Sequence, residues 1–292
     1  MFHVKHSTLI LFVFIDIYFE KCYNKYNIEK RYIMSRIISI ANQKGGVGKT
    51  TTTINLSACL AEKGKKVLVV DIDPQGNTSS GLGIDKDNIE NTIYELFLDE
   101  CTLEECIQKS VVDNLDVIPS NINLSGAEIE LISIEDKEYM LKNILDSLRD
   151  KYDFILIDCP PSLNLLTVNA MTASDTVLVP IQCEYYALEG LTQLIHTIDL
   201  ITERLNSKLE IEGIVFTMYD ARTNLSTQVV ENVKENLDRR IYKTIIPRNV
   251  RLAEAPSYGM PIIMYDAKSS GAEAYRFLAE EVIERETEGE WL

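Results

Sequence analysis

The sequence lacks the residue patterns that hold metal ions, iron–sulfur clusters or disulfide frameworks. Its six cysteines include no C-x-x-C pair. Cys101 and Cys106 lie five residues apart with no histidine near them, so buried or incidental thiols are a better interpretation than a metal site. Cysteines scattered without a framework are typical of a protein from a reducing cytosol.

A hydrophobic run long enough to cross a membrane is also missing. The apolar stretch from Leu9 to Phe19 has only eleven residues and contains Asp16, whereas a spanning helix needs about 20. Lys5 precedes this stretch as it would in a signal peptide, but no small residues of a cleavage site follow it. The sequence therefore predicts no spanning helix and disfavours an export signal.

Basic residues are scarce relative to acidic ones. The chain has 29 lysines and arginines against 45 aspartates and glutamates, for a formal net charge of −16. DNA and anionic lipid repel such a chain overall, so contact with either needs a local basic patch. Internal repeats and low-complexity linkers are absent as well, and 292 residues with 46% hydrophobic content indicate one globular domain.

The sequence does contain a glycine-rich phosphate loop, between a predicted strand at Ile37–Ala41 and a predicted helix from about Thr50 to Glu62. It ends as the pattern G-x-x-x-x-G-K-[ST] does, although Gln43 replaces the first glycine. Glycines let successive N–H groups converge on phosphate oxygens, and the helix directs its positive end at them. We predict that Lys49 neutralises phosphate charge and that the Thr50 hydroxyl ligates Mg²⁺. The predicted nucleotide-binding residues of the loop are Lys44, Gly45, Gly46, Val47, Gly48, Lys49, Thr50 and Thr51.

Two further predicted strands end in carboxylates. The strand that begins at Lys66 leads to Asp71 and Asp73, which are two residues apart and are therefore expected on one face. For Asp71, a strand-end cap and a role in the site are equally good interpretations. The apolar strand that begins at Tyr152 ends in Asp158, the Walker B arrangement, which predicts a carboxylate that holds Mg²⁺ through water.

From Met34 to about Phe277 the chain resembles ParA/Soj-type partition ATPases, members of the ParA/MinD superfamily with a deviant Walker A loop. The loop sequence KGGVGKTT and the segments DIDPQGNTSSGLG, IDCPPSLNLLTVNA, PIQCEYYALEGL and IPRNVRLAEAPSYGMPI carry the resemblance. It implies a single-domain α/β P-loop NTPase fold, with a twisted, mostly parallel sheet and helices on both faces. It also implies an ATPase that uses ATP and Mg²⁺.

The resemblance assigns catalytic roles to two residues. It implies that Lys44 reaches across a dimer to the nucleotide of the partner subunit and stabilises charge on the transferred phosphoryl group, as an arginine finger does elsewhere. It implies that Asp73 orients the attacking water.

The resemblance also assigns binding roles near the end of the chain. Met218, Pro247 and Asn249 match the region that contacts adenine. Arg222 and Arg251 match surface arginines that bind DNA without sequence preference when both subunits of the ATP dimer contribute them. Contacts to phosphate alone make such binding strongly dependent on salt.

The function implied is an ATP-dependent switch. A homodimer with sandwiched ATP binds the nucleoid in the cytoplasm and avoids membrane, and a ParB-type centromere-binding protein then stimulates hydrolysis. The switch drives chromosome or plasmid segregation. Regulation of replication initiation or of sporulation is a second role that the resemblance allows.

Three other classes share the ATP site. The main alternative is a MinD-like division-site ATPase, which ends in a basic amphipathic helix that lies on membrane. The end of this chain, from Glu284 onward, has four glutamates against one arginine, which disfavours that alternative. A cluster-carrying reductase needs two facing cysteines, and neither Cys159 nor Cys183 has the ligand context of that family. A small-molecule kinase is disfavoured because no acceptor-binding lid is visible.

Residues 1–33 differ in character from the rest, and we interpret them as a non-native or mis-annotated extension before a domain at 34–292. Met34 is followed at once by the strand that leads to the phosphate loop. The first six residues, MFHVKH, can be back-translated into the palindrome ATGTTTCACGTGAAACAT, which resembles a bacterial centromere-like site. A coincidental hexapeptide on a genuine extension is the alternative.

Overall fold

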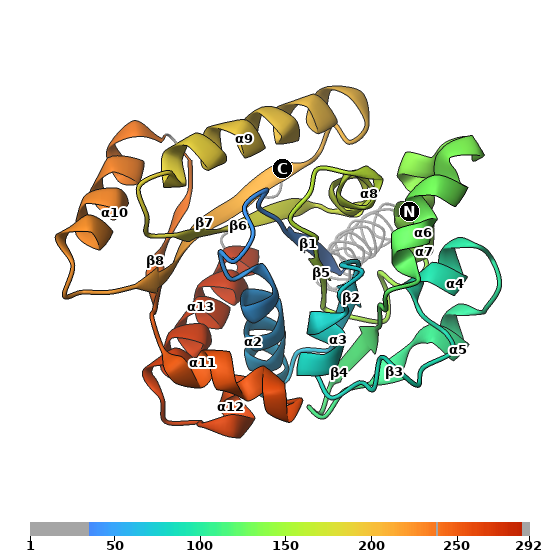
Figure 1. The fold of residues 1–292 in the computed structure, drawn as a ribbon, viewed down its shortest axis with the longest axis horizontal. Coiled ribbons are helices and arrows are strands. Elements are labelled where there is room, and N and C mark those ends of the chain that lie inside the picture. The colour runs from blue at the N-terminus through green and yellow to red at the C-terminus, as the bar shows by residue number, and fades with distance from the viewer. Residues whose placement is uncertain (1–34, 238, 288–292) are drawn as a thin grey trace, which may run out of the picture.

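The computed structural model describes residues 35–237 and 239–287 (Figure 1). The predicted extension at residues 1–33 lies outside these residues, as do residues 288–292 of the acidic tail. The described residues form one eight-stranded sheet with helices on both faces, which confirms the predicted fold class.

Short apolar segments form the strands of the sheet. β1, β2 and β5 are buried along their whole lengths, as expected for parallel strands that helices cover on both sides. The order across the sheet is β3-β4-β2-β5-β1-β6-β7-β8, and every neighbouring pair is parallel except β3 with β4. The strands are β1 (Arg36–Ile40), β2 (Val67–Asp71), β3 (Gln108–Lys109), β4 (Leu115–Ile118), β5 (Phe154–Asp158), β6 (Thr176–Gln182), β7 (Glu210–Tyr219) and β8 (Ile241–Pro247).

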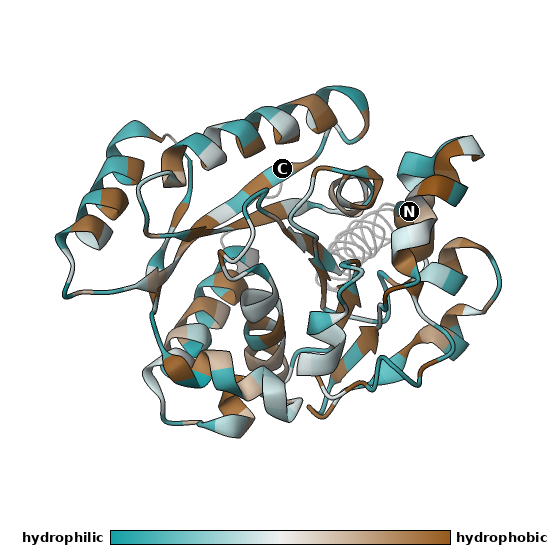
Figure 2. Cartoon of the chain, in the orientation of Figure 1, coloured by the Kyte–Doolittle hydropathy of each residue, from teal (hydrophilic) through white to brown (hydrophobic). Residues whose placement is uncertain are grey.

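The helices divide into two layers, each with its own hydrophobic core. One core takes residues from α4, α6, α7, α8, α9 and α10, and the other takes residues from α2, α11, α12 and α13. Figure 2 shows hydrophobic and hydrophilic stripes along α9, which buries one face against the sheet. The bounds are α2 (Lys49–Glu62), α3 (Asn77–Gly81), α4 (Ile93–Phe97), α5 (Leu103–Cys106), α6 (Leu124–Glu130), α7 (Met140–Asp146), α8 (Leu165–Ala173), α9 (Ala187–Arg204), α10 (Asn224–Asn236), α11 (Val250–Glu254), α12 (Ile262–Tyr265) and α13 (Ser270–Thr287).

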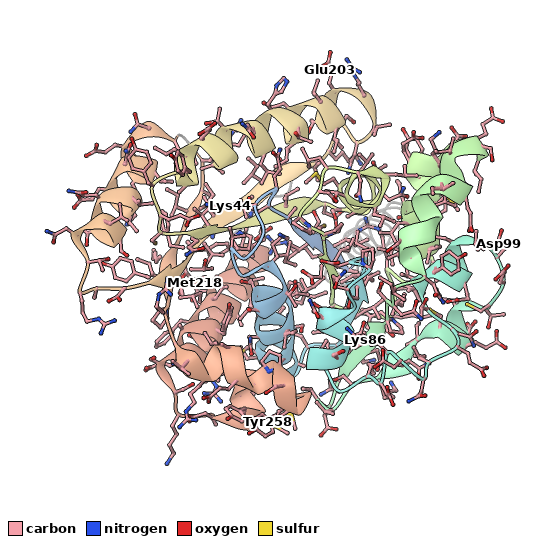
Figure 3. The ribbon with its side chains drawn as sticks, viewed as in Figure 1. Lys44, Lys86, Asp99, Glu203, Met218 and Tyr258 are labelled. Atoms are coloured by element: carbon pink, nitrogen blue, oxygen red, sulfur yellow. The ribbon has the colours of Figure 1, made fainter. Side chains whose placement is uncertain are left out.

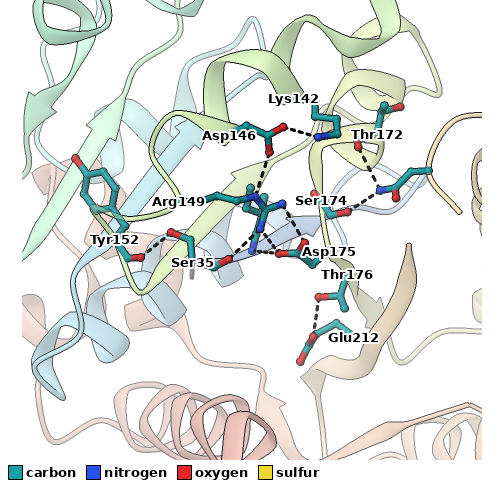
Figure 4. Close-up of polar contacts among 12 residues, drawn as sticks. Ser35, Lys142, Asp146, Arg149, Tyr152, Thr172, Ser174, Asp175, Thr176 and Glu212 are labelled. Carbon is teal, nitrogen blue, oxygen red and sulfur yellow. Dashed lines mark hydrogen bonds and ion pairs between the residues drawn. The ribbon is translucent and has the colours of Figure 1, made fainter. Parts of the chain in front are cut away.

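A polar network closes the amino-terminal edge of the sheet (Figure 4). The Arg149 guanidinium donates to both carboxylate oxygens of Asp175, at 2.9 and 3.0 Å, and to the Ser35 carbonyl at 3.0 Å. Asp175 also accepts the backbone N–H of Ile37 at 2.8 Å. These bonds join the starts of β1 and β6 to the loop before β5, so the polar groups at this edge are used within the fold.

The opposite, carboxyl-terminal edge gathers the segments that the sequence singled out. β1 lies between β5 and β6, and β5 lies between β1 and β2. The register pairs Asp158 with Ile40 on one side and with Asp71 on the other. The phosphate loop after β1 and the carboxylates that end β2 and β5 therefore meet at one place, the edge where ligands bind in open α/β sheets.

Candidate active site

The phosphate loop after β1 presents unused backbone donors. Gly46 and Gly48 have φ angles of +75° and +91°, a left-handed conformation that glycine adopts without strain. Among the described residues, the N–H groups of Gly45, Gly46 and Gly48 donate to no acceptor. Unpaired N–H groups at the start of α2 form a site for an anion such as phosphate.

Lys49 lies buried where the loop joins α2. Its Nζ donates to the carbonyl oxygen of Lys44 at 3.1 Å, which holds the ammonium within the loop. Burial lowers the pKa of Lys49, and the negative charges of Asp158 and Asp73 act in the opposite direction. The structure thus places this cation between the loop and the carboxylates of the neighbouring strands.

Asp158 is fully buried and lies among three hydroxyl groups. It accepts hydrogen bonds from Thr50 at 2.8 Å, Thr78 at 2.6 Å and Thr53 at 3.1 Å. Burial raises the pKa of Asp158 to about 6, while the Thr78 and Thr50 hydroxyls lower it. This donor set contains only oxygen, as Mg²⁺ prefers, so Thr50 and Asp158 fit the roles predicted for them. No group of three or more histidine, cysteine, aspartate or glutamate side chains within the described part of the chain could hold a metal by itself.

Asp71 anchors the segment that follows β2. It accepts the backbone N–H of Ser79 at 2.8 Å, the Ser79 hydroxyl at 2.7 Å and the N–H of Asp73 at 3.1 Å. Burial raises the pKa of Asp71 to about 7, and the neighbouring charge of Asp158 adds to this effect. Of the two interpretations left open by the sequence, these bonds favour a structural cap for the start of α3.

Asp73 lies beyond the end of β2 and is half-buried. Strand alternation therefore does not extend to it, because β2 stops at Asp71, and the expectation that Asp71 and Asp73 share one face stays a prediction. One Asp73 oxygen accepts the N–H of Gln75 at 2.9 Å. The carboxylate remains close enough to Lys49 for its charge to raise the pKa of that lysine.

Lys44 lies at the rim of the phosphate loop, and Figure 3 labels it near the centre of the view. Its side chain is 40% exposed and forms an ion pair with Glu184, in the turn between β6 and α9. Tyr185 and Tyr186 follow in that turn, both strongly exposed, with ring centroids 5.1 Å apart. The sequence analysis missed Glu184 as a partner of Lys44, because no local pattern joins residues so far apart.

Met218, Pro247 and Asn249 come together where β7 and β8 end side by side. Tyr219 pairs with Pro247 in the sheet, and the N–H of Arg248 donates to the Tyr219 carbonyl at 2.9 Å. Met218 has a φ angle of +51°, which is unusual for a residue other than glycine and is often found at functional sites. Asn249 caps α11 by accepting the N–H of Arg251 at 2.8 Å.

Arg222 and Arg251 are exposed, and carboxylates of the same chain contact both. Arg222 has a side chain that is 87% exposed, and it binds both oxygens of Asp220, with Nε–Oδ1 and Nη2–Oδ2 distances of 2.8 and 2.7 Å. Arg251 binds Glu254 at 2.8 Å and lies 3.7 Å from Asp266. The sequence analysis named the two arginines but not these counter-charges.

Thr217 is a further residue that the sequence analysis missed. It is buried in β7, and its hydroxyl donates to the carbonyl oxygen of Val47 in the phosphate loop at 2.7 Å. The two residues are 170 positions apart, so only the strand order of the sheet brings them together.

The cysteines of the described residues are free thiols. Cys159 and Cys183 are buried, and burial raises the pKa of the Cys183 thiol to about 11. Burial likewise raises the pKa of Cys106, which lies in α5. This is the environment expected of inert structural thiols. Among the described helices, none is both long and apolar enough to span a bilayer.

Comparison of the sequence with known proteins gives consistent relatives. A family model described as an AAA domain matches residues 35–211. The sporulation initiation inhibitor protein Soj of Bacillus subtilis is 58% identical over 249 residues, which cover 85% of this chain and 98% of the relative. The chromosome partitioning protein ParA of Myxococcus xanthus is 53% identical over 254 residues, covering 87% of this chain and 90% of the relative.

Solved structures share the fold. A cobyrinic acid a,c-diamide synthase from Mycobacterium smegmatis with bound ADP and magnesium matches with a TM-score of 0.78 and 36% identity, over 89% of this chain and 98% of that one. The cell division ATPase MinD of Pyrococcus furiosus matches with a TM-score of 0.72 and 32% identity, over 86% of this chain and all of that one (100%).

Proposed function

This chain belongs to the ParA/Soj family of chromosome-partitioning P-loop ATPases, and from that premise we propose that ATP switches it between a free form and a homodimer that binds DNA without regard to sequence. The switch acts in the cytoplasm, on the nucleoid, and moves a chromosome or plasmid. The name of the Bacillus subtilis relative, a sporulation initiation inhibitor, makes regulation of sporulation or of replication initiation a second role to test.

The nucleotide is proposed to occupy the carboxyl edge of the sheet. The unpaired N–H groups of Gly45, Gly46 and Gly48 and the Lys49 ammonium bind the phosphates. Met218, Pro247 and Asn249 line the adenine end. The Thr50 hydroxyl and, through water, Asp158 would hold Mg²⁺, which would supply positive charge to neutralise the phosphates. The bound magnesium and ADP in the synthase of similar fold support this assignment.

The position of Lys44 is the observation that carries the dimer proposal. Lys49 already fills the cation position inside the loop, whereas Lys44 lies half-exposed at its rim. In the dimer, Lys44 exchanges Glu184 for the phosphoryl oxygens of the nucleotide held by the other subunit, and it stabilises charge that develops there during transfer. Asp73 orients the attacking water, a role that its half-buried carboxylate near Lys49 allows.

DNA is proposed to bind through Arg222 and Arg251 of both subunits. One subunit has a net charge of −16, so two exposed arginines do not overcome the repulsion by DNA on their own. Dimerisation doubles their number on a single surface, which makes binding depend on ATP. Arg248 directly follows β8, its N–H bonds to Tyr219 at the end of β7, and it extends this surface. Arg239 and Arg240 precede β8 and lie at the opposite edge of the sheet.

A ParB-type centromere-binding protein is the proposed partner that stimulates hydrolysis. Lys44 pairs with Glu184 within its own chain, and we propose that the partner protein favours the arrangement in which Lys44 contacts the nucleotide of the other subunit instead. Hydrolysis then separates the subunits and releases DNA, with ATP acting as a conformational ligand.

The proposal is tested by DNA binding with ATP, ADP or no nucleotide. We expect binding by the wild-type chain only with ATP, and its loss in an Arg222→Ala, Arg251→Ala double variant. A Lys109→Ala, Lys208→Ala double variant removes the same charge from elsewhere on the chain and should bind as the wild type does. Equal DNA affinity with ATP, with ADP and without nucleotide would contradict the proposal. So would wild-type DNA affinity in the double arginine variant.

The MinD-like alternative predicts ATP-dependent sedimentation with vesicles of anionic phospholipid. We expect none, because the described part of the chain ends in an acidic helix segment and anionic lipid repels negative charge. Sedimentation of the chain with such vesicles would favour the alternative.

A further inference from the structure

The geometry points to Thr217 as a positioning residue for nucleotide binding: its hydroxyl fixes the Val47–Gly48 peptide so that the Gly48 N–H faces the bound phosphate. This inference rests on ATP binding by the P-loop and is independent of the DNA switch proposed above.

Thr217 reaches the phosphate loop from a rigid part of the sheet. It pairs with Gln182 across β6 and β7, and its carbonyl oxygen accepts the N–H of Cys183 at 3.4 Å. Its side chain is buried, and the hydroxyl donates to the Val47 carbonyl at 2.7 Å. The methyl group lies on the same side, 3.6 Å from where a Cβ of Gly48 would be. The loop is therefore braced by a strand to which it is not connected in sequence.

The direction of the Val47 carbonyl determines the direction of the next N–H group. In a trans peptide the C=O and the following N–H lie in one plane and point in opposite directions, and the described chain contains no cis peptide bond. Because the Val47 carbonyl points toward β7, the Gly48 N–H points away from β7. Among the described residues this N–H has no acceptor, so it is available for a phosphate oxygen.

The other polar side chains around the loop bond elsewhere and not to the Val47–Gly48 peptide. Lys49 bonds to the Lys44 carbonyl, and the Thr50 and Thr53 hydroxyls bond to Asp158. Within residues 35–237 and 239–287, Thr217 is the one side chain that bonds to the backbone of residues 45–48. A glycine-containing loop has easy access to other backbone conformations, and fixing one of them before the ligand arrives lowers the cost of binding.

The test compares Thr217→Val, which removes the hydroxyl and keeps the shape, with Thr217→Ser, which keeps the hydroxyl. ADP affinity is measured on the full chain with a fluorescent ADP analogue. We expect Thr217→Val to weaken ADP binding about tenfold, near the net contribution of one hydrogen bond, and Thr217→Ser to stay within about threefold of the wild type. A Thr172→Val variant removes a buried hydroxyl from α8 and should leave the ADP affinity unchanged.

Steady-state hydrolysis separates positioning from general damage. Thr217→Val should raise KM for ATP while kcat changes by less than about threefold, with a melting temperature near that of the Thr172→Val control. Wild-type ADP affinity in Thr217→Val would overturn the inference. So would equal losses in the valine and serine variants, because serine keeps the hydroxyl and an equal loss would then not be due to the hydroxyl alone. A folded Thr217→Ser chain that loses ADP binding tenfold would overturn it as well.

Discussion

The three cations with proposed roles outside their own subunit all form ion pairs within it. The pairs are Lys44–Glu184, Arg222–Asp220 and Arg251–Glu254. Exposed pairs of this kind contribute only about 0–1 kcal/mol to stability, so exchanging the carboxylate for a phosphate costs little. The free subunit thus keeps its cations neutralised until a nucleotide on another subunit, or DNA, offers a stronger partner.

Lys44→Gln should separate nucleotide binding from hydrolysis. We expect ATP affinity within about threefold of the wild type, because Lys49 supplies the cation inside the loop, and hydrolysis lowered at least about a hundredfold, as when an arginine finger is lost. A titration with ATP measures the affinity, and turnover at saturating ATP measures hydrolysis. Light scattering at saturating ATP reports whether the dimer forms. Lys63→Gln, which removes an exposed lysine paired with Glu280, is the control. Solitary molecules with ATP, together with undiminished turnover in Lys44→Gln, would refute the dimer mechanism.

Asp73→Ala should trap the ATP dimer. Removing the carboxylate proposed to orient water leaves the phosphate loop and Lys49 intact, so ATP still binds and the dimer stays on DNA. We expect turnover to fall about a hundredfold or more and the lifetime of the DNA complex to lengthen in proportion, as measured by dissociation in excess competitor DNA. Asp87→Ala, at an exposed position further along the chain, should behave as the wild type does. Normal hydrolysis by Asp73→Ala would rule out this role.

At the scale of elements, β7 links the phosphate loop to the residues proposed to contact adenine and DNA. Thr217 near its end bonds to the phosphate loop, Met218 follows with a left-handed backbone, and Arg222 lies in the loop just beyond the strand. The neighbouring strand β8 ends beside it at Pro247 and leads into α11, which contains Arg251. The phosphate loop and the two arginines proposed to bind DNA are thus connected through two neighbouring strand ends.

Asp220→Asn should tighten DNA binding in the ATP state. Asp220 holds the Arg222 guanidinium through two bonds, and asparagine removes its charge while retaining an oxygen that can accept the Arg222 N–H. We expect affinity for random-sequence DNA to rise about threefold to tenfold, with a steeper dependence on salt as Arg222 engages phosphate. Fluorescence anisotropy at several salt concentrations measures both quantities. Asp113→Asn, at an exposed aspartate before β4, is the control for the change in charge alone. Unchanged DNA affinity in Asp220→Asn would contradict the idea that Asp220 keeps Arg222 from binding phosphate.

At the scale of the whole molecule, one buried glutamate joins the sheet to the last helix. Glu212 in β7 is fully buried and contacts the guanidinium groups of Arg36 in β1 and Arg285 in α13. It also accepts the hydroxyls of Thr176 in β6 at 2.7 Å and Tyr242 in β8 at 2.6 Å. Four elements from both ends of the described chain therefore converge on one carboxylate.

Glu212→Gln should destabilise the fold by about 3–5 kcal/mol, because it removes the buried charge that contacts both the Arg36 and the Arg285 guanidinium groups. Urea unfolding measures this loss, and Glu210→Gln, at an exposed position of the same strand, should change the free energy of unfolding by less than about 1 kcal/mol. A loss as small as that of Glu210→Gln would show that the cluster is not needed for stability.

The same cluster predicts a dependence on pH. Burial raises the pKa of Glu212, but Arg36 and Arg285 outweigh it, so the pKa in the folded protein lies below its ordinary value. Its stabilising contribution is therefore present above the unfolded pKa and is lost as pH falls through the folded pKa. This acid-dependent part of the unfolding curve should be absent in Glu212→Gln.

Contiguous features were predictable from the sequence. The phosphate loop, the strand before it and the helix after it depend on glycine conformations and apolar runs between Arg36 and Glu62. The structure has β1 and α2 within one residue of the predicted bounds. The acid at the end of β5 follows from the same local pattern. The resemblance in segments far from the loop was enough to predict the family.

Only the tertiary structure decided which distant groups meet. Thr217 braces Val47, Glu184 pairs with Lys44, and Asp71 is buried against Asp158 because the strand order places β7 beyond β6 and β5 between β1 and β2. No window of the sequence contains that order, since it depends on the packing free energy of segments separated by tens to hundreds of residues. The sequence by itself therefore determined the chemistry of the phosphate loop, and the fold decided which side chains hold that loop in position.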